Sequence, residues 1–253
     1  MNNRNSISTF ETSAITAALP GRVFLHEGFR WDGFDAYIVD IDGTLMRTED
    51  RIHFRSFAES IERVLNRQVS LDGISLHGNT DPAILREALT NAGIAEAEWA
   101  PKMQSVLAAM CSIIEQKREL LRPTVLPGVV AFLEHLTVQG AVLGLGTGNL
   151  EEIGWLKLEV AGLRKWFRFG GFSDQHETRP ALIANAAVEA RRVAGPDATL
   201  CVVGDTPRDI AAAVANGLAV ITVATGGFSF EELMECNPDA CTESLQDLLG
   251  VQD

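Results

Sequence analysis

The sequence predicts an α/β fold in which a doubly wound, mostly parallel, Rossmann-like sheet carries an inserted α-helical cap subdomain. Four apolar, β-branched runs alternate with helical patterns, and one long stretch between the first two runs reads as helix alone. Continuous apolar strands between helices are typical of a parallel sheet that is covered on both faces. The length of 253 residues, of which 46% are hydrophobic, suits one large domain with an insertion.

The chain begins with residues 1–34, which are polar and only weakly periodic. We expect a leader there that is partly disordered or packs against the body. Helix patterns at 126–140 and 206–217 end at Gly140 and Gly217, as helices often do. The predicted strands are 36–41, 141–147, 199–205 and 219–225.

Between the first two strands, about 75 residues contain three amphipathic helix patterns, at 53–67, 80–93 and 97–121, and no strand pattern. A usual crossover between parallel strands is far shorter, so the sequence indicates an inserted helical subdomain. The predicted organisation is a leader at 1–34, an α/β core at 35–47 and 124–253, and a helical cap at 48–123.

The net charge of -13 argues against binding to nucleic acid or anionic lipid, since phosphate backbones are held by basic patches. No apolar run reaches the roughly 18 residues of a membrane span, and the start lacks an apolar signal core. We therefore expect a cytoplasmic protein. The four cysteines show no metal-ligand spacing and are expected to be reduced.

Acidic residues gather where the predicted strands end. Asp40 and Asp42 follow the first strand, and Asp205 follows the third, with Asp209 one turn later. Ligands bind beyond the carboxyl ends of the strands in such sheets, so these carboxylates should converge. Carboxylates at such short distances from one another repel by several kcal/mol unless a cation lies between them. Oxygen ligands without histidine or cysteine favour Mg²⁺, which often also takes a phosphate oxygen.

The positions of the first two aspartates suggest different chemical roles. Asp40, at the strand end, is placed to attack phosphorus and form an aspartyl-phosphate. Asp42, two residues further on, can protonate the leaving oxygen and later activate water. Gly43 permits the tight turn that this arrangement needs.

A phosphoryl site is predicted after the second strand. Thr147 and the N–H groups of Gly148 and Asn149 precede a helix, and helix N-termini bind anions. Glu151 also suits the helix dipole, so capping alone explains part of this pattern. Arg179 is the candidate for a fixed positive charge, with a mobile surface arginine as the alternative.

Four motifs, "DIDGT", "GLGTGN", "RP" and "VVGDTPRD", occur in this order, each after a predicted strand or at a helix start. Together they resemble the haloacid dehalogenase superfamily over residues 35–249, in particular its phosphoglycolate-phosphatase-like branch with a helical C1-type cap. The resemblance implies that Asp40 is the nucleophile and Asp42 the acid/base. It further implies that Thr147 and Arg179 hold the phosphoryl group, and that Asp205, Asp209 and the Asp42 main-chain carbonyl bind Mg²⁺ with Asp40.

One motif departs from the commonest family pattern, because arginine replaces lysine at position 179. Arginine keeps the charge but offers a forked donor geometry. The second aspartate, Asp42, disfavours a dehalogenase or a phosphonatase, since those relatives lack this acid/base.

A cap over a polar crevice can exclude water and open for release, with hinges expected at 46–50 and 123–128. The loop "HGNTDPAI" is expected to contact substrate through Gly78, Asn79 and Thr80. Asp81 is either a helix-start acid or a ligand. His53 lies where relatives often have a histidine near the hinge, although a surface or capping histidine is the alternative.

The sequence therefore predicts a Mg²⁺-dependent phosphomonoester hydrolase acting on a small phosphorylated metabolite through an aspartyl-phosphate. A β-phosphoglucomutase-like sugar phosphomutase with the same residues is the alternative, followed by a non-catalytic regulatory member. The particular substrate and the choice between monomer and dimer stay open.

Overall fold

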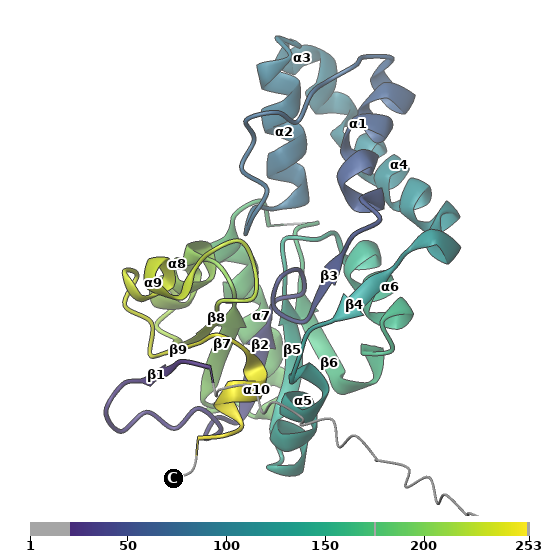
Figure 1. The fold of residues 1–253 in the computed structure, drawn as a ribbon. Coiled ribbons are helices and arrows are strands. Elements are labelled where there is room, and N and C mark those ends of the chain that lie inside the picture. The colour runs from purple at the N-terminus through teal and green to yellow at the C-terminus, as the bar shows by residue number, and fades with distance from the viewer. Residues whose placement is uncertain (1–20, 175, 252–253) are drawn as a thin grey trace, which may run out of the picture.

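The computed structural model describes residues 21–174 and 176–251, and its core is a seven-stranded sheet (Figure 1). The strand order is β1-β9-β8-β7-β2-β5-β6. Neighbouring strands run parallel except β1 and β9, which pair antiparallel at one edge. The strands are β1 (Val23–Leu25), β2 (Ala36–Val39), β5 (Val142–Gly146), β6 (Phe167–Gly171), β7 (Leu200–Gly204), β8 (Ala219–Val223) and β9 (Ala240–Thr242).

Helices cover both faces of this sheet because its central strands are apolar on both sides. In β2, Tyr37 and Val39 join the core on one face, whereas Ala36 and Ile38 join the core on the other. The first face is covered by α5 (Val129–Val138), α6 (Glu151–Val160) and α10 (Leu245–Leu248). The second is covered by α7 (Arg179–Ala194), α8 (Pro207–Ala215) and α9 (Phe230–Met234). The predicted doubly wound α/β class is confirmed.

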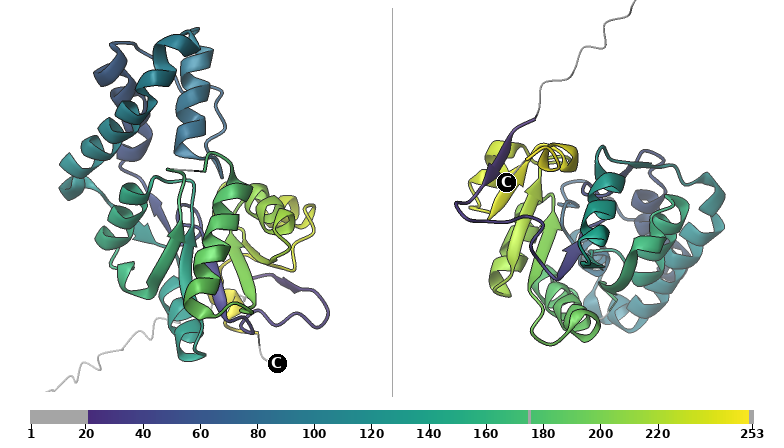
Figure 2. Two further views of the ribbon diagram at one scale, coloured as in Figure 1. Left: turned by 180° about the vertical axis from the view of Figure 1, so that it is seen from behind. Right: turned by 90° about the horizontal axis from the view of Figure 1, so that it is seen from below.

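The cap is attached through a two-stranded antiparallel ribbon of β3 (Met46–Thr48) and β4 (Pro123–Val125). These strands lie at the two segments that the sequence suggests as hinges. The cap helices between them stand together beyond one end of the sheet (Figure 2). They are α1 (Ile52–Leu65), α2 (Asp81–Asn91), α3 (Glu96–Trp99) and α4 (Met103–Gln116), with short 3₁₀ turns at Ala100–Lys102 and Arg118–Leu120.

The cap has a hydrophobic core of its own, which includes Phe57, Leu85 and Met110. The same cluster extends to Leu150 and Ile153 at the start of α6. The cap therefore packs against the α/β core through the helix that follows the second motif, and this contact places its inner face over the ends of β2, β5 and β7.

Residues 21–34, the second part of the predicted leader, pack against the α/β core, which is one of the two alternatives that the sequence leaves open. Strand β1 pairs with β9, and Trp31 is 6% exposed and stacks on Phe132 of α5. The rest of the predicted leader, residues 1–20, lies outside the described residues. Strands of three residues such as β1 and β9 are too short to show an alternating pattern in the sequence. The pairing of β1 with β9 also joins segments that lie far apart along the chain, so no local turn indicates it.

In the described part of the chain, no helix combines the length and apolar character needed to cross a membrane.

Candidate active site

A cavity of about 330 Å³ lies between the ends of the central strands and the inner face of the cap. Core and cap both contribute to its wall, so closing the cap over the strand ends shapes the site. The core residues are Asp40, Asp42, Thr147, Gly148, Asn149, Arg179, Asp205 and Thr206, and the cap residues include Thr48, Arg51, His53, Phe54, Phe57, Leu76, His77, Gly78, Asn79, Asp81 and Ile84.

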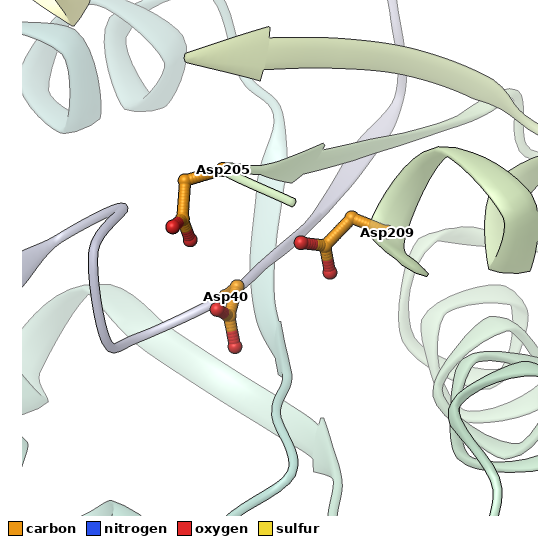
Figure 3. A group of neighbouring side chains, drawn as sticks. All are labelled: Asp40, Asp205 and Asp209. Carbon is orange, nitrogen blue, oxygen red and sulfur yellow. The ribbon is translucent and has the colours of Figure 1, made fainter. Parts of the chain in front are cut away.

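Three aspartates converge beyond the strand ends (Figure 3), and two of them, Asp40 and Asp205, line this cavity. Asp40, Asp205 and Asp209 each place one carboxylate oxygen within 4.8 Å of the others. Strands β2 and β7 are neighbours with Val39 opposite Val203, so the residues that follow them emerge side by side. Asp209 joins them from the first turn of α8. All three side chains are buried.

The crowding of these carboxylates shifts their ionisation. Burial raises the pKa of Asp40 to about 6, although the neighbouring Arg179 opposes the shift. Burial, together with the negative charges of Asp40 and Asp209, raises the pKa of Asp205 to about 8. Both shifts mean that the site resists holding three negative charges by itself. A cluster of buried oxygen ligands with this surplus of charge fits a hard divalent cation such as Mg²⁺.

Arg179 supplies a positive charge inside the same cluster. Its Nη2 lies 2.8 Å from Asp40 Oδ1, donates to the Gly146 carbonyl at 3.1 Å, and also pairs with Asp209. The residue is 6% exposed, because it opens α7 beneath the strand ends. Arg179 is therefore not a mobile surface residue, and its guanidinium offsets part of the negative charge of the three carboxylates.

Two glycines let the backbone approach Asp205 closely. Gly43 has φ +90°, and a Cβ built there would lie 2.4 Å from Asp205 Oδ2. A Cβ on Gly226 would lie 1.6 Å from the same oxygen. Any side chain at either position would displace the carboxylate, so the chain holds Asp205 in a tight cradle.

Asp42 forms its hydrogen bonds with α6 and the turn before it, and not with the three clustered aspartates. Its carboxylate accepts from Lys157 Nζ at 2.6 and 2.8 Å and from Asn149 Nδ2 at 2.8 Å. The protein surroundings disfavour the charged carboxylate, but the adjacent ammonium of Lys157 outweighs them and lowers the pKa of Asp42 below its usual value. Asp42 thus lines the cavity as an anion held by a buried cation.

Lys157 is a site residue that the sequence analysis missed. The letters "GWLKLEVAG" read as an ordinary amphipathic helix, and a lysine there is usually taken as a solvated side chain. Its position four residues after the buried Ile153 was the available signal, because residues four apart share a helix face. Lys157 is 2% exposed.

The second motif forms the predicted turn before α6. Thr147 is buried, and its Oγ1 accepts from the N–H of Asn149 at 3.3 Å and from Asn149 Nδ2 at 2.6 Å. A Cβ on Gly148 would lie 2.0 Å from the carbonyl oxygen of Asn79 in the cap. Glycine at position 148 therefore allows the cap loop to rest directly on this turn.

The candidate cap residues fall into two groups. His53, Gly78 and Asn79 line the cavity. Thr80 is instead buried at the start of α2, where its Oγ1 accepts from the Ala83 N–H and donates to the carbonyl of Glu177. The structure therefore gives Thr80 a capping and docking position.

Asp81 is the first residue of α2 and docks the cap on the core. Its N–H donates to the Gly148 carbonyl at 2.8 Å, and its Oδ2 accepts from the Leu150 N–H at 2.9 Å. Its Oδ1 lies 3.1 Å from His53 Nε2. Asp81 is therefore a helix-start acid, as one of the two interpretations of the sequence has it, and the structure adds its contact with the start of α6.

A doubly wound sheet, a buried acidic cluster at its strand ends and an inserted helical cap define a class of capped α/β proteins whose strand-end carboxylates could hold a metal ion. A family model described as haloacid dehalogenase-like hydrolase matches residues 37–223. The chain belongs to this family, and the resemblance drawn from the motifs is confirmed.

Individual relatives are more distant. A protein of Dickeya dadantii described as "Probable phosphatase IndB" is 28% identical over 127 residues, which are 50% of this chain and 55% of the relative. In this match the chain spans about half the length of its curated relative.

Solved structures share the fold. A predicted phosphoglycolate phosphatase from Haemophilus somnus aligns with a TM-score of 0.61 at 20% identity, covering 86% of this chain and 97% of its own. CbbY from Rhodobacter sphaeroides, solved in complex with phosphate, aligns with a TM-score of 0.64 at 16% identity, covering 85% and 96%. The fold is therefore shared over nearly the whole length of these proteins.

Proposed function

We propose that the protein is a Mg²⁺-dependent phosphomonoester hydrolase that acts on a small phosphorylated metabolite through an aspartyl-phosphate. The observation that carries the proposal is the place of Asp40. It lines the cavity at the end of β2, in contact with Arg179 and within one acidic cluster with Asp205 and Asp209. A carboxylate so placed is a nucleophile beside a cation site.

Asp40, Asp205, Asp209 and the main-chain carbonyl of Asp42 would hold Mg²⁺. When bound, the ion supplies positive charge that keeps Asp40 ionised and offsets the charge of the phosphoryl oxygens. This assignment fits the raised pKa values of Asp40 and Asp205 without a cation.

The phosphoryl group is assigned to the turn before α6 and to Arg179. Thr147 Oγ1 and the N–H groups of Gly148 and Asn149 would donate to its oxygens, as helix starts do to anions. Arg179 Nε is buried and has no hydrogen-bond partner among the described residues, so a donor of this cation is available. The leaving group would be contacted by cap residues that line the cavity, namely His53, Gly78 and Asn79. Thr80 would act only by capping α2.

The reaction then has two balanced steps. An Asp40 oxygen bonds to phosphorus as the bond from phosphorus to the leaving oxygen breaks, and Asp42 in its protonated form, which is the minor form in the substrate-free protein, gives its proton to that oxygen. In the second step Asp42 takes a proton from water, the water oxygen bonds to phosphorus, and the Asp40 carboxylate is released with inorganic phosphate. Asp42 regains its proton in this step and is ready for the next turnover.

A screen of phosphorylated metabolites with Mg²⁺ tests the proposal by measuring release of inorganic phosphate. We expect hydrolysis of one or a few small phosphomonoesters, and none after the Mg²⁺ is chelated. Interconversion of isomers that needs a bisphosphate activator, without phosphate release, would instead identify a sugar phosphomutase. Binding of a phosphorylated ligand without any turnover would identify a non-catalytic regulatory member.

A further inference from the structure

The ammonium of Lys157 is a buried cation with three partner residues in the site. Its Nζ lies 2.6 and 2.8 Å from the two oxygens of Asp42, 2.8 Å from Asn149 Oδ1 and 2.9 Å from His53 Nδ1. An ammonium has three N–H donors, so the carboxylate, the amide and the imidazole use all of them. All three partners line the cavity, whereas Lys157 itself is not among the described lining residues.

The contact with Lys157 determines which ring nitrogen of His53 accepts a hydrogen bond. An ammonium can only donate, so Nδ1 of His53 accepts from Lys157. The other ring nitrogen, Nε2, is buried and lies 3.1 Å from Asp81 Oδ1, but it makes no hydrogen bond among the described residues. The ring is also stacked on Phe57, with centroids 5.2 Å apart and planes at 25°. The stack on Phe57 and the contact with Lys157 thus place the His53 ring with Nδ1 toward the ammonium.

This contact crosses from the cap to the core. His53 is the second residue of α1 in the cap, whereas Lys157 and Asn149 belong to α6 and the turn before it. Asp42 follows β2, on the core side of the β3–β4 ribbon. A movement of the cap about that ribbon would break the bond between His53 and Lys157 and leave the bonds of Lys157 to Asp42 and Asn149 in place.

We propose that Lys157 is a positioning residue that fixes the Asp42 carboxylate toward the leaving group, and that its bond to His53 makes this placement depend on a closed cap. The proposal rests on the proposed function, because it assigns a partner to the acid/base of that reaction. With the cap closed, three partners hold the ammonium, and the ammonium and Asn149 together hold the carboxylate. With the cap open, one N–H of the buried ammonium loses its acceptor, which a buried cation tolerates poorly, so the ammonium can turn and the carboxylate that it holds is fixed less firmly.

A double-mutant cycle tests this dependence. Lys157→Met keeps the length of the side chain without its donors. We expect kcat to fall about 10- to 100-fold, as for other residues that orient a reacting group, with KM changed by less than about threefold. His53→Leu should lower kcat less, and it should lower kcat by a smaller factor in the Lys157→Met background than in the protein that keeps Lys157. The exposed Lys165, which stacks on Trp166, provides the control, and Lys165→Met should leave kcat unchanged.

A conservative variant separates positioning from simple packing. In His53→Asn the amide oxygen stands near the place of Nδ1 and can still accept from Lys157. We expect it to recover most of the kcat that His53→Leu loses. If Lys157→Met fails to fold, as judged by circular dichroism and thermal melting, this pair of His53 variants decides the matter in the wild-type lysine background.

Three results would overturn the proposal: an unchanged kcat in Lys157→Met, equal losses in His53→Asn and His53→Leu, or a His53→Leu loss of the same factor with and without Lys157. A wild-type protein that releases phosphate from none of the screened esters is a different failure. It would refute the proposed function, and the role given to Lys157 would be refuted with it.

Discussion

Arg179 is the charged neighbour that acts most strongly on the pKa of Asp40, the candidate nucleophile, and it lowers that pKa. It contacts Asp40 and Asp209 from below the strand ends and is almost fully buried. Burying a guanidinium costs several kcal/mol unless its partners are well placed, and here two carboxylates and a carbonyl serve that purpose. Arg179 therefore pre-orients Asp40 in the absence of any substrate.

Asp40→Asn should abolish phosphate release and leave the fold intact, because an amide keeps the shape of the carboxylate but cannot form the acyl-phosphate. The loss should be at least about 10³-fold in kcat, since the covalent route is removed. Steady-state assays beside circular dichroism spectra provide the measurement. Retained turnover would remove Asp40 from the role of nucleophile.

The ion pair of Asp42 with Lys157 could not be predicted from the sequence, although the positions of the aspartates could. Asp40, Asp42 and Asp205 could be placed from their positions at strand ends, because parallel strands deliver the residues after them to one edge. The pairing of Asp42 with Lys157 could not, since it depends on how α6 is rotated and on where the turn at Asn149 places that helix.

Helix α8 links stability to the site through its first turn. Thr206 and Asp209 form a capping box, in which Thr206 Oγ1 accepts from the Asp209 N–H and Asp209 Oδ2 accepts from the Thr206 N–H. The same aspartate belongs to the acidic cluster, so the cap of this helix also orients a candidate metal ligand.

Thr206→Ala should lower the free energy of unfolding by about 1 kcal/mol, the usual cost of losing an N-cap, and should also weaken Mg²⁺ activation. The matched control is Ser229, which forms a capping box with Glu232 at the start of α9, away from the cavity lining. Ser229→Ala should cost a similar free energy and leave the Mg²⁺ dependence unchanged. Urea denaturation and Mg²⁺ titration of activity measure both effects. Equal Mg²⁺ responses in the two variants would separate the Thr206 cap from the metal site.

At the scale of elements, the sequence predicts the central strands and the first two cap helices well, but it takes α3 and α4 as one helix over 97–121 and does not predict the sheet edges. The apolar runs that become β2, β5, β7 and β8 are long enough to show their pattern. Strand β6 has the sequence "FRFGG", whose glycines argue against a strand. The structure explains one of them, because a Cβ on Gly171 would lie 2.3 Å from the Leu182 carbonyl of α7.

For the whole molecule, the raised pKa values of the cluster set how stability depends on pH. The pKa of Asp205 is about 8 in the folded protein against an ordinary value of 3.8, so between these pH values the folded state holds a proton that the unfolded chain has released. The free energy of unfolding of the metal-free protein should therefore fall as pH rises through this window, and Asp40, with a pKa of about 6, acts in the same direction.

Mg²⁺ should reverse this trend, because it binds the deprotonated carboxylates of the folded state and competes with their protons. We expect the gain in melting temperature on adding Mg²⁺ to be larger at pH 8 than at pH 6. Thermal melts at both pH values, with and without Mg²⁺, provide the check. Asp205→Asn should reduce both the pH dependence of the metal-free protein and the gain from Mg²⁺. A gain that shrinks as pH rises would contradict the assignment of these residues as ligands.

The ribbon of β3 and β4 makes the cap a self-contained cassette. Thr48 lies directly opposite Pro123, so the inserted chain leaves and re-enters the core at neighbouring points. Exchange of the whole bundle for a different one, or for a short turn, would leave the strand register of the core unaltered, at the expense of baring Leu150 and Ile153 on α6. Evolution can thus replace the cap, and with it the residues that would recognise a substrate, while the α/β core keeps its structure.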